Sequence, residues 1–163
     1  MALQNPRRIG LISDTHGLLR EEAVKALRGV DLILHAGDVG KPEILERLKT
    51  LAPVVAVRGN IDTTPWAQEL PATAVVGAGP ATFYILHDVH ALDLNPKAAG
   101  FRCVVSGHSH QPGSVARDGV LYINPGSAGP RRFSLPISLA LLDLRTEPWG
   151  VQFIELSGIT RRS

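Results

Sequence analysis

The chain has 163 residues, a length that suits one domain around a single hydrophobic core. Hydrophobic residues make up 44% and charged residues 20% of the chain, and no apolar run is long enough to span a membrane. The formal net charge of +2 is too small to indicate a nucleic-acid partner. A single cysteine, Cys103, excludes an internal disulfide and fits a reducing compartment, and the first residues lack the apolar core of a signal peptide. We therefore expect a cytoplasmic protein with no membrane partner.

The first part of the chain alternates short apolar runs with helical patterns. The apolar runs predict buried strands, and the spacing of apolar residues between them predicts helices. The expected elements are a strand at 8–13, a helix at 19–27, a strand at 30–35, a helix opened by Pro42, and a strand at 54–57. This alternation predicts parallel strands joined by right-handed crossovers.

The second part of the chain is mostly strand. Strands are expected at 72–76 and 81–86, joined by a turn at 77–80, and then at 101–106, 113–116, 120–123, 137–144 and 151–156, with a short helix at 95–99. Asp118-Gly119 is a strong hairpin signal, and the last two strands are predicted to pair antiparallel. The predicted fold class is therefore α/β (α+β), a two-sheet β-sandwich with helices on its outer faces, in one domain over residues 1–163.

Five polar clusters directly follow five of the predicted strands. They are Asp14 with His16, then Asp38, Asn60, His87, and His108 with His110. Sites in open α/β sheets form beyond the carboxyl ends of the strands, where all of these clusters lie. Each polar group alone could cap a strand or a helix. Their shared placement predicts that all seven side chains converge in one site.

The types of these side chains predict a metal site. Two carboxylates, one amide oxygen and four imidazoles are oxygen and nitrogen donors of the kind that bind divalent metals. One ion rarely uses seven such ligands, whereas two ions that share a carboxylate use them well. Asp38 is the candidate for the shared ligand, because a carboxylate at the exit of a buried strand is costly to desolvate without a positive partner. We expect two divalent ions, Mn²⁺ first, with iron, zinc and nickel as alternatives.

The charge of such a site predicts the chemistry of its substrate. Two divalent ions bring four positive charges, and Asp14, Asp38 and a bridging hydroxide offset three, which leaves about +1 facing solvent. An anionic phosphate is attracted to this charge, and two ions roughly 3.5–4 Å apart clamp phosphoryl oxygens and generate the attacking hydroxide. Lowering the pKa of a bound water from 15.7 to near 7 corresponds to about 12 kcal/mol. The sequence therefore predicts a metal-dependent phosphoester hydrolase.

The ordered set of motifs resembles the calcineurin-like metallophosphoesterase family. The pattern Asp-x-His, Gly-Asp, Gly-Asn, a strand-end His and Gly-His-x-His occurs here in the family's order, over about residues 8 to 144. The Arg58-Gly-Asn-x-Asp62 block and the Asn124-Pro-Gly-Ser127 segment resemble the small bacterial and archaeal phosphodiesterase branch. The resemblance implies a four-layer fold of two sheets and outer helices. It also implies two metal positions, the first held by Asp14, His16, Asp38 and His110, the second by Asp38, Asn60, His87 and His108.

Within this set, Asp38, Asn60 and His87 are the residues expected to take part most directly in catalysis. Further candidates for substrate binding, or for contacts that orient the ligands, are Asp62, His90, Asn124, Ser127 and Arg131. Each of these has a plainer interpretation as a turn residue, a cap or a solvated side chain. His35, on a buried strand, is predicted to be a core histidine with satisfied hydrogen bonds rather than a ligand.

Two positions depart from the family pattern. Many relatives have a histidine directly after the Gly-Asn pair, proposed to protonate the leaving group, and Ile61 stands there in this chain. Asp88 replaces a glycine that is usual after the strand-end histidine in this branch. Its negative charge is expected either to tighten metal binding or to repel phosphate, and the sequence leaves that choice open.

The predicted function is hydrolysis of phosphodiesters by a hydroxide held between two metal ions. Two alternatives share the fold: a binding module that works through its surfaces, as the retromer scaffold subunit does, and a nuclease or cyclic-nucleotide phosphodiesterase. A scaffold would be expected to lose ligand positions, and none is lost here. The expected partner is a phosphate-ester substrate, and because relatives are often dimers or larger assemblies, a homo-oligomer stays open.

Overall fold

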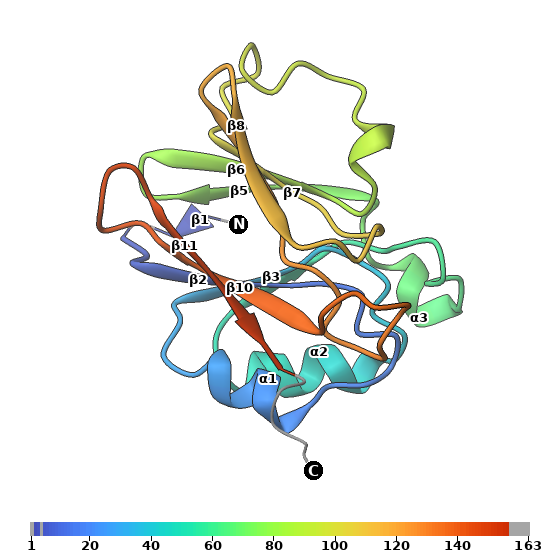
Figure 1. Cartoon of the computed structure of the whole chain (residues 1–163). Coiled ribbons are helices and arrows are strands. Elements are labelled where there is room, and N and C mark those ends of the chain that lie inside the picture. The colour runs from blue at the N-terminus through green and yellow to red at the C-terminus, as the bar shows by residue number, and fades with distance from the viewer. Residues whose placement is uncertain (1, 4, 157–163) are drawn as a thin grey trace.

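The computed structural model describes residues 2–3 and 5–156 of the chain (Figure 1). Its elements in chain order are β1 (Ala2–Leu3), β2 (Arg8–Ile12), α1 (Glu21–Ala26), β3 (Leu32–His35), α2 (Pro42–Lys49), β4 (Val54–Ala56), α3 (Pro65–Gln68), β5 (Thr73–Ala78), β6 (Ala81–Leu86), the 3₁₀ helix η1 (Val89–Ala91), β7 (Cys103–Val105), β8 (Gly113–Arg117), β9 (Val120–Asn124), β10 (Ser138–Asp143) and β11 (Gly150–Glu155). No helix among the described residues is long and apolar enough to cross a membrane.

The strands form two mixed sheets. The smaller sheet has the order β11-β10-β2-β3-β4, and the larger has the order β1-β5-β6-β7-β9-β8. Strands β2, β3 and β4 are parallel, as the strand–helix alternation predicts, and β10 pairs antiparallel with both β2 and β11. In the larger sheet, β5 and β6 form an antiparallel hairpin, and β7 runs parallel to both β6 and β9. The predicted fold class, a mixed α/β protein built on two sheets, is confirmed.

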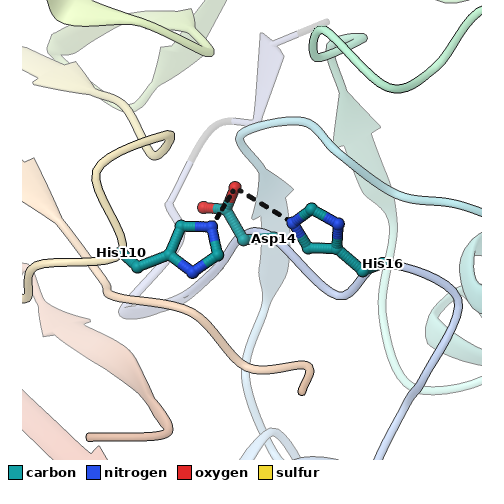
Figure 2. A group of neighbouring side chains, drawn as sticks. All are labelled: Asp14, His16 and His110. Atoms are coloured by element: carbon teal, nitrogen blue, oxygen red, sulfur yellow. Dashed lines mark ion pairs between the residues drawn. The ribbon is translucent and has the colours of Figure 1, made fainter. Parts of the chain in front are cut away.

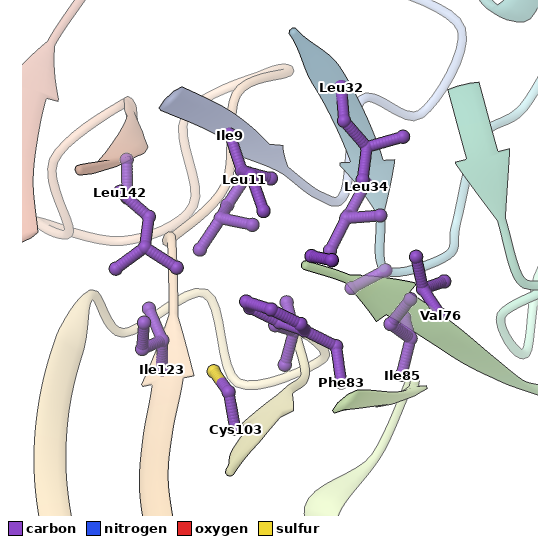
Figure 3. Packing of buried hydrophobic residues seen from close by; sticks show 14 of the residues in the cluster. Ile9, Leu11, Leu32, Leu34, Val76, Phe83, Ile85, Cys103, Ile123 and Leu142 are labelled. Atoms are coloured by element: carbon purple, nitrogen blue, oxygen red, sulfur yellow. The ribbon is translucent and has the colours of Figure 1, made fainter. Parts of the chain in front are cut away.

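The hydrophobic core lies between the two sheets (Figure 3). Alternate residues of β2 and β3 point inward from the smaller sheet and meet side chains of β5, β6, β7 and β9 from the larger one. Phe83 is fully buried there and stacks on Trp149, with ring centroids 5.5 Å apart. Cys103 belongs to the same core, and burial raises the pKa of its thiol, which keeps it protonated. Close packing of this layer fixes the distance between the sheets.

Helices α1 and α2 cover the outer face of the smaller sheet (Figure 1). Pro42 lies in the first turn of α2, where its missing N–H costs little. Ile44, Leu45 and Leu48 form the buried stripe of this helix and pack toward the sheet. The short α1 follows the loop that carries Asp14 and therefore ties that loop to the back of the sheet.

The outer face of the larger sheet is covered by a loop in the described part of the chain, so helices flank one face rather than both. Leu92, Leu94 and Phe101 pack on the outer side of this sheet, and the Phe101 ring stacks on Tyr84 at 5.1 Å. The helix predicted at 95–99 is wrong: this segment forms turns. The Asn95 side chain accepts the backbone N–H of Ala98 at 3.2 Å, which offers the chain an alternative to helical hydrogen bonding.

Smaller differences concern the ends of elements. Strand β5 continues to Ala78, so the connection to β6 is a tighter turn at Gly79 and Pro80 than the loop predicted at 77–80. Sequence patterns gave no indication of β1 or α3, which are too short for periodicity to reveal. None of these differences moves the strand ends that carry the polar clusters.

Candidate metal centre

The polar clusters follow the carboxyl ends of strands from both sheets. Asp14 and His16 follow β2, Asp38 follows β3, and Asn60 follows β4 in the smaller sheet. His87 follows β6, and the loop after β7 carries His108 and His110, in the larger sheet. The side chains meet where the two sheets adjoin, so neither sheet alone contains the site.

One group of donors surrounds Asp14 (Figure 2). Its Oδ1 atom lies 3.5 Å from His110 Nε2 and 3.8 Å from His16 Nε2, and the carboxylate sits between the two rings. His16 Nε2 is also 3.5 Å from Asp38 Oδ2. Asp14, His16, Asp38 and His110, the residues that the family resemblance assigns to one ion, are therefore neighbours in space.

A second group continues from Asp38. Its Oδ2 atom lies 3.3 Å from His87 Nε2, which is in turn 3.3 Å from His108 Nδ1. His108 Nδ1 lies 3.2 Å from Asn60 Oδ1. Asp38 Oδ2 therefore faces both His16 of the first group and His87 of the second. Asp14 Oδ1 lies farther from the same two nitrogens, at 3.8 Å from each.

The spacing and the missing partners of these atoms fit divalent ions. Ligands at 2.0–2.2 Å from one ion are about 3–3.5 Å from each other, close to the separations observed here. Asp14 Oδ1 and His16 Nε2 are buried and have no hydrogen-bond partner among the described residues. Such atoms each cost about 1–3 kcal/mol when they remain unsatisfied. A bound cation would satisfy them, so the residues present fit the metals that the motifs predict.

The two oxygens of each buried carboxylate have different surroundings. Asp14 Oδ2 accepts the Ser13 hydroxyl at 2.8 Å and the His108 backbone N–H at 3.1 Å, which leaves Oδ1 to face the imidazoles. Asp38 Oδ1 accepts the backbone N–H of Ile61 at 3.0 Å, and Oδ2 is the atom that faces His16 and His87. One oxygen of each carboxylate is thus held by the protein, and the other is available to a cation.

The same contacts keep the carboxylates ionised. Burial raises the pKa of Asp14, but the imidazoles of His110 and His16 and the charge of His87 outweigh it and hold the pKa well below its usual range. Burial likewise raises the pKa of Asp38, and the contacts with His87 and the Ile61 N–H bring it below the ordinary value. For His87, burial lowers the pKa, yet the two carboxylates raise it overall. Both carboxylates are charged at neutral pH, as metal ligands must be.

The backbone at the candidate ligands is unusual. Left-handed φ angles occur at Asp14 (57°), His16 (48°), Asp38 (57°), His108 (71°) and His110 (63°). A residue other than glycine loses roughly 1–2 kcal/mol in this conformation. Residues held in such conformations cluster at functional sites, where the surrounding structure maintains them. The sharp turns aim consecutive donors, such as those of Asp14 and His16, into the same space.

Backbone hydrogen bonds hold these turns against one another. The N–H groups of Asp14, His16 and Gly17 donate to carbonyls of residues 37–39 at 2.9–3.0 Å, which joins the loops after β2 and β3. Gly59 is required at its position, because a Cβ atom there would overlap the backbone and the carboxylate of Asp38. The loop after β4 can therefore approach Asp38 closely enough to place Asn60 in the second group.

His35 supports the loop of Asp38 from inside the sheet. Its Nδ1 accepts the Gly37 N–H at 3.1 Å, so Nε2 carries the hydrogen and lies 3.0 Å from the Thr15 hydroxyl. Thr15 in turn donates to the carbonyl of Val39 at 2.8 Å. His35 is fully buried, and burial lowers its pKa to about 4. It is a core histidine with satisfied hydrogen bonds, as the sequence predicts.

Three of the candidates for supporting roles anchor the loops of the candidate ligands. Asp62 is buried and accepts the N–H groups of Val39 and Gly40 at 3.1 Å and of Gly59 at 2.8 Å, which joins the loops after β3 and β4. Asn124 donates to the carbonyl of Gly107 at 3.0 Å. The Ser127 hydroxyl donates to the carbonyl of Asp14 at 3.0 Å.

The two remaining candidates are not hydrogen-bonded to the candidate ligands among the described residues. His90 is exposed on η1, and the Arg131 guanidinium donates to the carbonyl of Leu135 at 3.4 Å. Neither side chain makes a hydrogen bond or ion pair with a candidate ligand within residues 2–3 and 5–156. Sequence reasoning also missed Ser13 and the backbone donors of Ile61 and His108. The hydroxyl beside Asp14 was visible in the sequence, whereas the backbone donors give no sequence signal.

A cavity of about 380 Å³ opens beside the second group. Its lining includes Asn60, His87 and His108, together with Arg58, Thr73 and Asp88. Leu86 of β6, Ala91 of η1 and Ala72 add apolar side chains to the wall. A molecule bound over the donors therefore has room to extend in this direction.

Comparison with known proteins assigns the family. The model of the calcineurin-like phosphoesterase superfamily domain matches residues 8–147 of this chain. The chain belongs to the calcineurin-like phosphoesterase superfamily. One relative is a probable metallophosphoesterase from Methanothermobacter thermautotrophicus. It is 36% identical to this protein, and the match covers 95% of this chain and 96% of the relative. The family resemblance predicted from the motifs is confirmed.

Solved structures of calcineurin-like phosphoesterases and related proteins share the fold. An archaeal phosphodiesterase superposes with a TM-score of 0.78 at 25% identity, covering 91% of this chain and 99% of its own. Vacuolar protein sorting 29 of Cryptosporidium parvum superposes with a TM-score of 0.73 at 22% identity, covering 94% of this chain and 100% of its own. The second likeness shows the fold alone. The chain is thus a phosphodiesterase homologue with candidate metal-binding residues.

Replacing His35 tests the buried imidazole by its pH dependence. Because burial lowers the pKa of His35 from 6.5 to about 4, the unfolded chain binds a proton between these pH values and the folded chain does not. The contribution of His35 to the free energy of unfolding is therefore fully present above about pH 6.5. It decreases by roughly 3 kcal/mol as the pH falls to about 4. His35→Gln should remove this part of the pH dependence in urea unfolding of the metal-free protein. Equal slopes in wild type and variant would contradict the assignment.

Replacing Asp62 tests the anchor between the loops after β3 and β4. Asp62→Ala should lower the free energy of unfolding by about 2–4 kcal/mol, because three backbone N–H groups lose their acceptor. It should also weaken Mn²⁺ binding by roughly 10-fold or more in calorimetric titration. Asp31→Ala is the control, because Asp31 accepts backbone N–H groups of Arg7 and Arg8 away from the centre. Unchanged Mn²⁺ affinity in Asp62→Ala would show that the anchor does not position ligands.

Proposed function

We propose that this protein is a phosphodiesterase that uses two divalent metal ions, with Mn²⁺ as the expected metal. Membership of the superfamily and the likeness to an archaeal phosphodiesterase support the class of reaction. The observation that carries the proposal is the position of Asp38 Oδ2, which lies 3.5 Å from His16 Nε2 and 3.3 Å from His87 Nε2. In this proposal Asp14, His16, Asp38 and His110 hold the first ion. Asp38, Asn60, His87 and His108 hold the second.

The protein's own groups define the charge of the proposed site. When bound, the two ions supply a hydroxide nucleophile at neutral pH and positive charge for the phosphoryl oxygens. Asp14 and Asp38 are the carboxylates of the ligand set, and Asn60 and the imidazoles bind as neutral groups. The set thus leaves a positive charge that attracts an anionic diester. The Ile61 N–H anchors Asp38, and the Gly59 N–H bound to Asp62 anchors the loop of Asn60. His87 Nδ1 lies 2.8 Å from the carbonyl of Ala36, which orients this ring.

The side chain at position 61 bears on which leaving groups the proposed enzyme prefers. Ile61 is 41% exposed and offers no proton to a departing alkoxide. A leaving group that departs as a stable anion, such as a phenolate, does not require one. We therefore propose phosphodiesters with good leaving groups as the preferred substrates, with the cavity beside Asn60 and His87 receiving part of the molecule.

The other functions with this fold have weaker support. A surface-acting scaffold rests on fold likeness alone, because vacuolar protein sorting 29 is 22% identical to this chain. A nuclease or a cyclic-nucleotide phosphodiesterase uses the same reaction class, and a panel of purified phosphodiesters separates these substrates. We further propose that residues 1–163 form one domain, which the family match over residues 8–147 supports.

Replacing Asp38 is the direct test of the proposed function. Asp38→Asn should remove most bound metal, measured by elemental analysis, and lower hydrolysis of bis(p-nitrophenyl) phosphate by at least about 100-fold. This loss exceeds the roughly 10–100-fold typical of residues that only contact ligands. Asp118→Asn, in the exposed turn between β8 and β9, is the control for loss of one negative charge. Full activity with stoichiometric metal in Asp38→Asn would refute the shared ligand.

Position 61 provides a second test through the leaving group. Ile61→His introduces a general acid, a group that contributes about 10²–10⁴-fold where proton transfer limits the rate. The variant should hydrolyse alkyl diesters roughly 10-fold faster or more, with little change for p-nitrophenyl esters. Ile61→Gln is the matched control, because an amide does not deliver a proton at neutral pH. An equal change on both classes of ester would mean that position 61 does not face the leaving group.

A further inference from the structure

His108 presents its two ring nitrogens to different surroundings. Nδ1 points into the second group of donors, 3.2 Å from Asn60 Oδ1 and 3.3 Å from His87 Nε2. Nε2, on the other side of the ring, lies 3.9 Å from Asp88 Oδ2. Nδ1 is therefore the atom in position to bind a metal, and an unprotonated Nδ1 requires that Nε2 carry the hydrogen of the neutral ring.

Asp88 is held in a way that leaves one oxygen for this N–H group. Its Oδ1 accepts the backbone N–H of His90 at 3.0 Å and so caps η1. The remaining oxygen, Oδ2, is the one near His108 Nε2. The carboxylates of Asp14 and Asp38 show the same arrangement: one oxygen accepts a hydrogen bond from the protein, and the other faces an imidazole.

We propose that Asp88 is a positioning residue that accepts the Nε2–H of His108 and thereby strengthens binding of the second metal ion. The inference rests on the proposed function, because it takes His108 as a ligand. A metal-bound histidine almost always donates its other ring N–H to a carboxylate, a carbonyl or water, and this contact orients the ring and makes it a better ligand. Of the two effects that the sequence left open for Asp88, tighter metal binding or repulsion of phosphate, this proposal selects tighter metal binding.

The geometry makes this contact depend on the metal. The observed 3.9 Å is about 1 Å longer than a charge-assisted hydrogen bond. The side chains of His108 and Asp88 are 45% and 37% exposed, so water competes for both groups in the absence of metal. A cation held at Nδ1 would make Nε2–H a stronger donor, and a small rotation of either side chain would bring Nε2 and Asp88 Oδ2 within hydrogen-bonding distance.

Titration of the metal-free full-length protein with Mn²⁺, followed by calorimetry, tests the proposal. Asp88→Asn and Asp88→Ser both keep a side-chain acceptor that can cap η1. In Asp88→Asn that oxygen is used by the cap, and in Asp88→Ser the side chain is too short to reach His108. Both should weaken one of two Mn²⁺ sites by roughly 10–100-fold and leave the other unchanged. Asp93→Asn, an exposed carboxylate of the following loop, is the control for charge.

The protonation state of His108 gives a direct readout that a general structural effect would not reproduce. Nitrogen-15 NMR of the Zn²⁺-loaded protein should show His108 with Nδ1 bound to metal and a protonated Nε2. Its Nε2–H proton signal should lie downfield in wild type and move upfield in Asp88→Asn. An unprotonated Nε2, or a signal unaffected by the substitution, would overturn the proposed contact.

The outcomes separate this inference from the proposed function. Two Mn²⁺ sites in wild type with unchanged affinities in both Asp88 variants would overturn the role of Asp88 and leave the phosphodiesterase proposal intact. Failure of the wild type to bind Mn²⁺ would overturn both. A loss confined to one site in the Asp88 variants, with none in Asp93→Asn, supports the contact.

Discussion

The site depends on two carboxylates buried side by side. Asp14 is fully buried and Asp38 nearly so, and both lie within 3.8 Å of the same His87 nitrogen. Removing such charges from water costs several kcal/mol per ion unless positive charge and hydrogen bonds compensate. The protein satisfies one oxygen of each with a hydroxyl or backbone N–H and leaves the other facing imidazoles. The positive charge that completes this arrangement is what a pair of cations would contribute.

This constraint explains why the centre lies where the two sheets adjoin. The smaller sheet provides both carboxylates, His16 and Asn60, and the larger provides the imidazoles of His87, His108 and His110. Neither sheet alone brings the full set of carboxylate, amide and imidazole donors together. The left-handed backbone at five of these residues adds strain that the surrounding structure has to maintain. A ligand that binds only the folded chain stabilises it by mass action, so a bound cation would favour the packing of the two sheets.

The sequence predicted the parts that follow from periodicity and order. The apolar runs located the strands, and the polar residues directly after them indicated the edge where the sheets would place a site. Periodicity could not reveal which nitrogen of His108 faces inward, or that backbone N–H groups of Ile61 and His108 hold the carboxylates, since these depend on turns between distant segments. Asp62 was visible as a candidate, but its three backbone donors were not. His90 and Arg131 were singled out by their closeness in sequence to motifs, and their contact with substrate stays a prediction.

Anomalous diffraction from crystals of the protein grown with Mn²⁺ tests the shared carboxylate most directly. The account predicts two manganese peaks on either side of Asp38, roughly 3.5–4 Å apart, with His16 near one and His87 near the other. A single peak, or two peaks of which only one lies within bonding distance of Asp38, would contradict it.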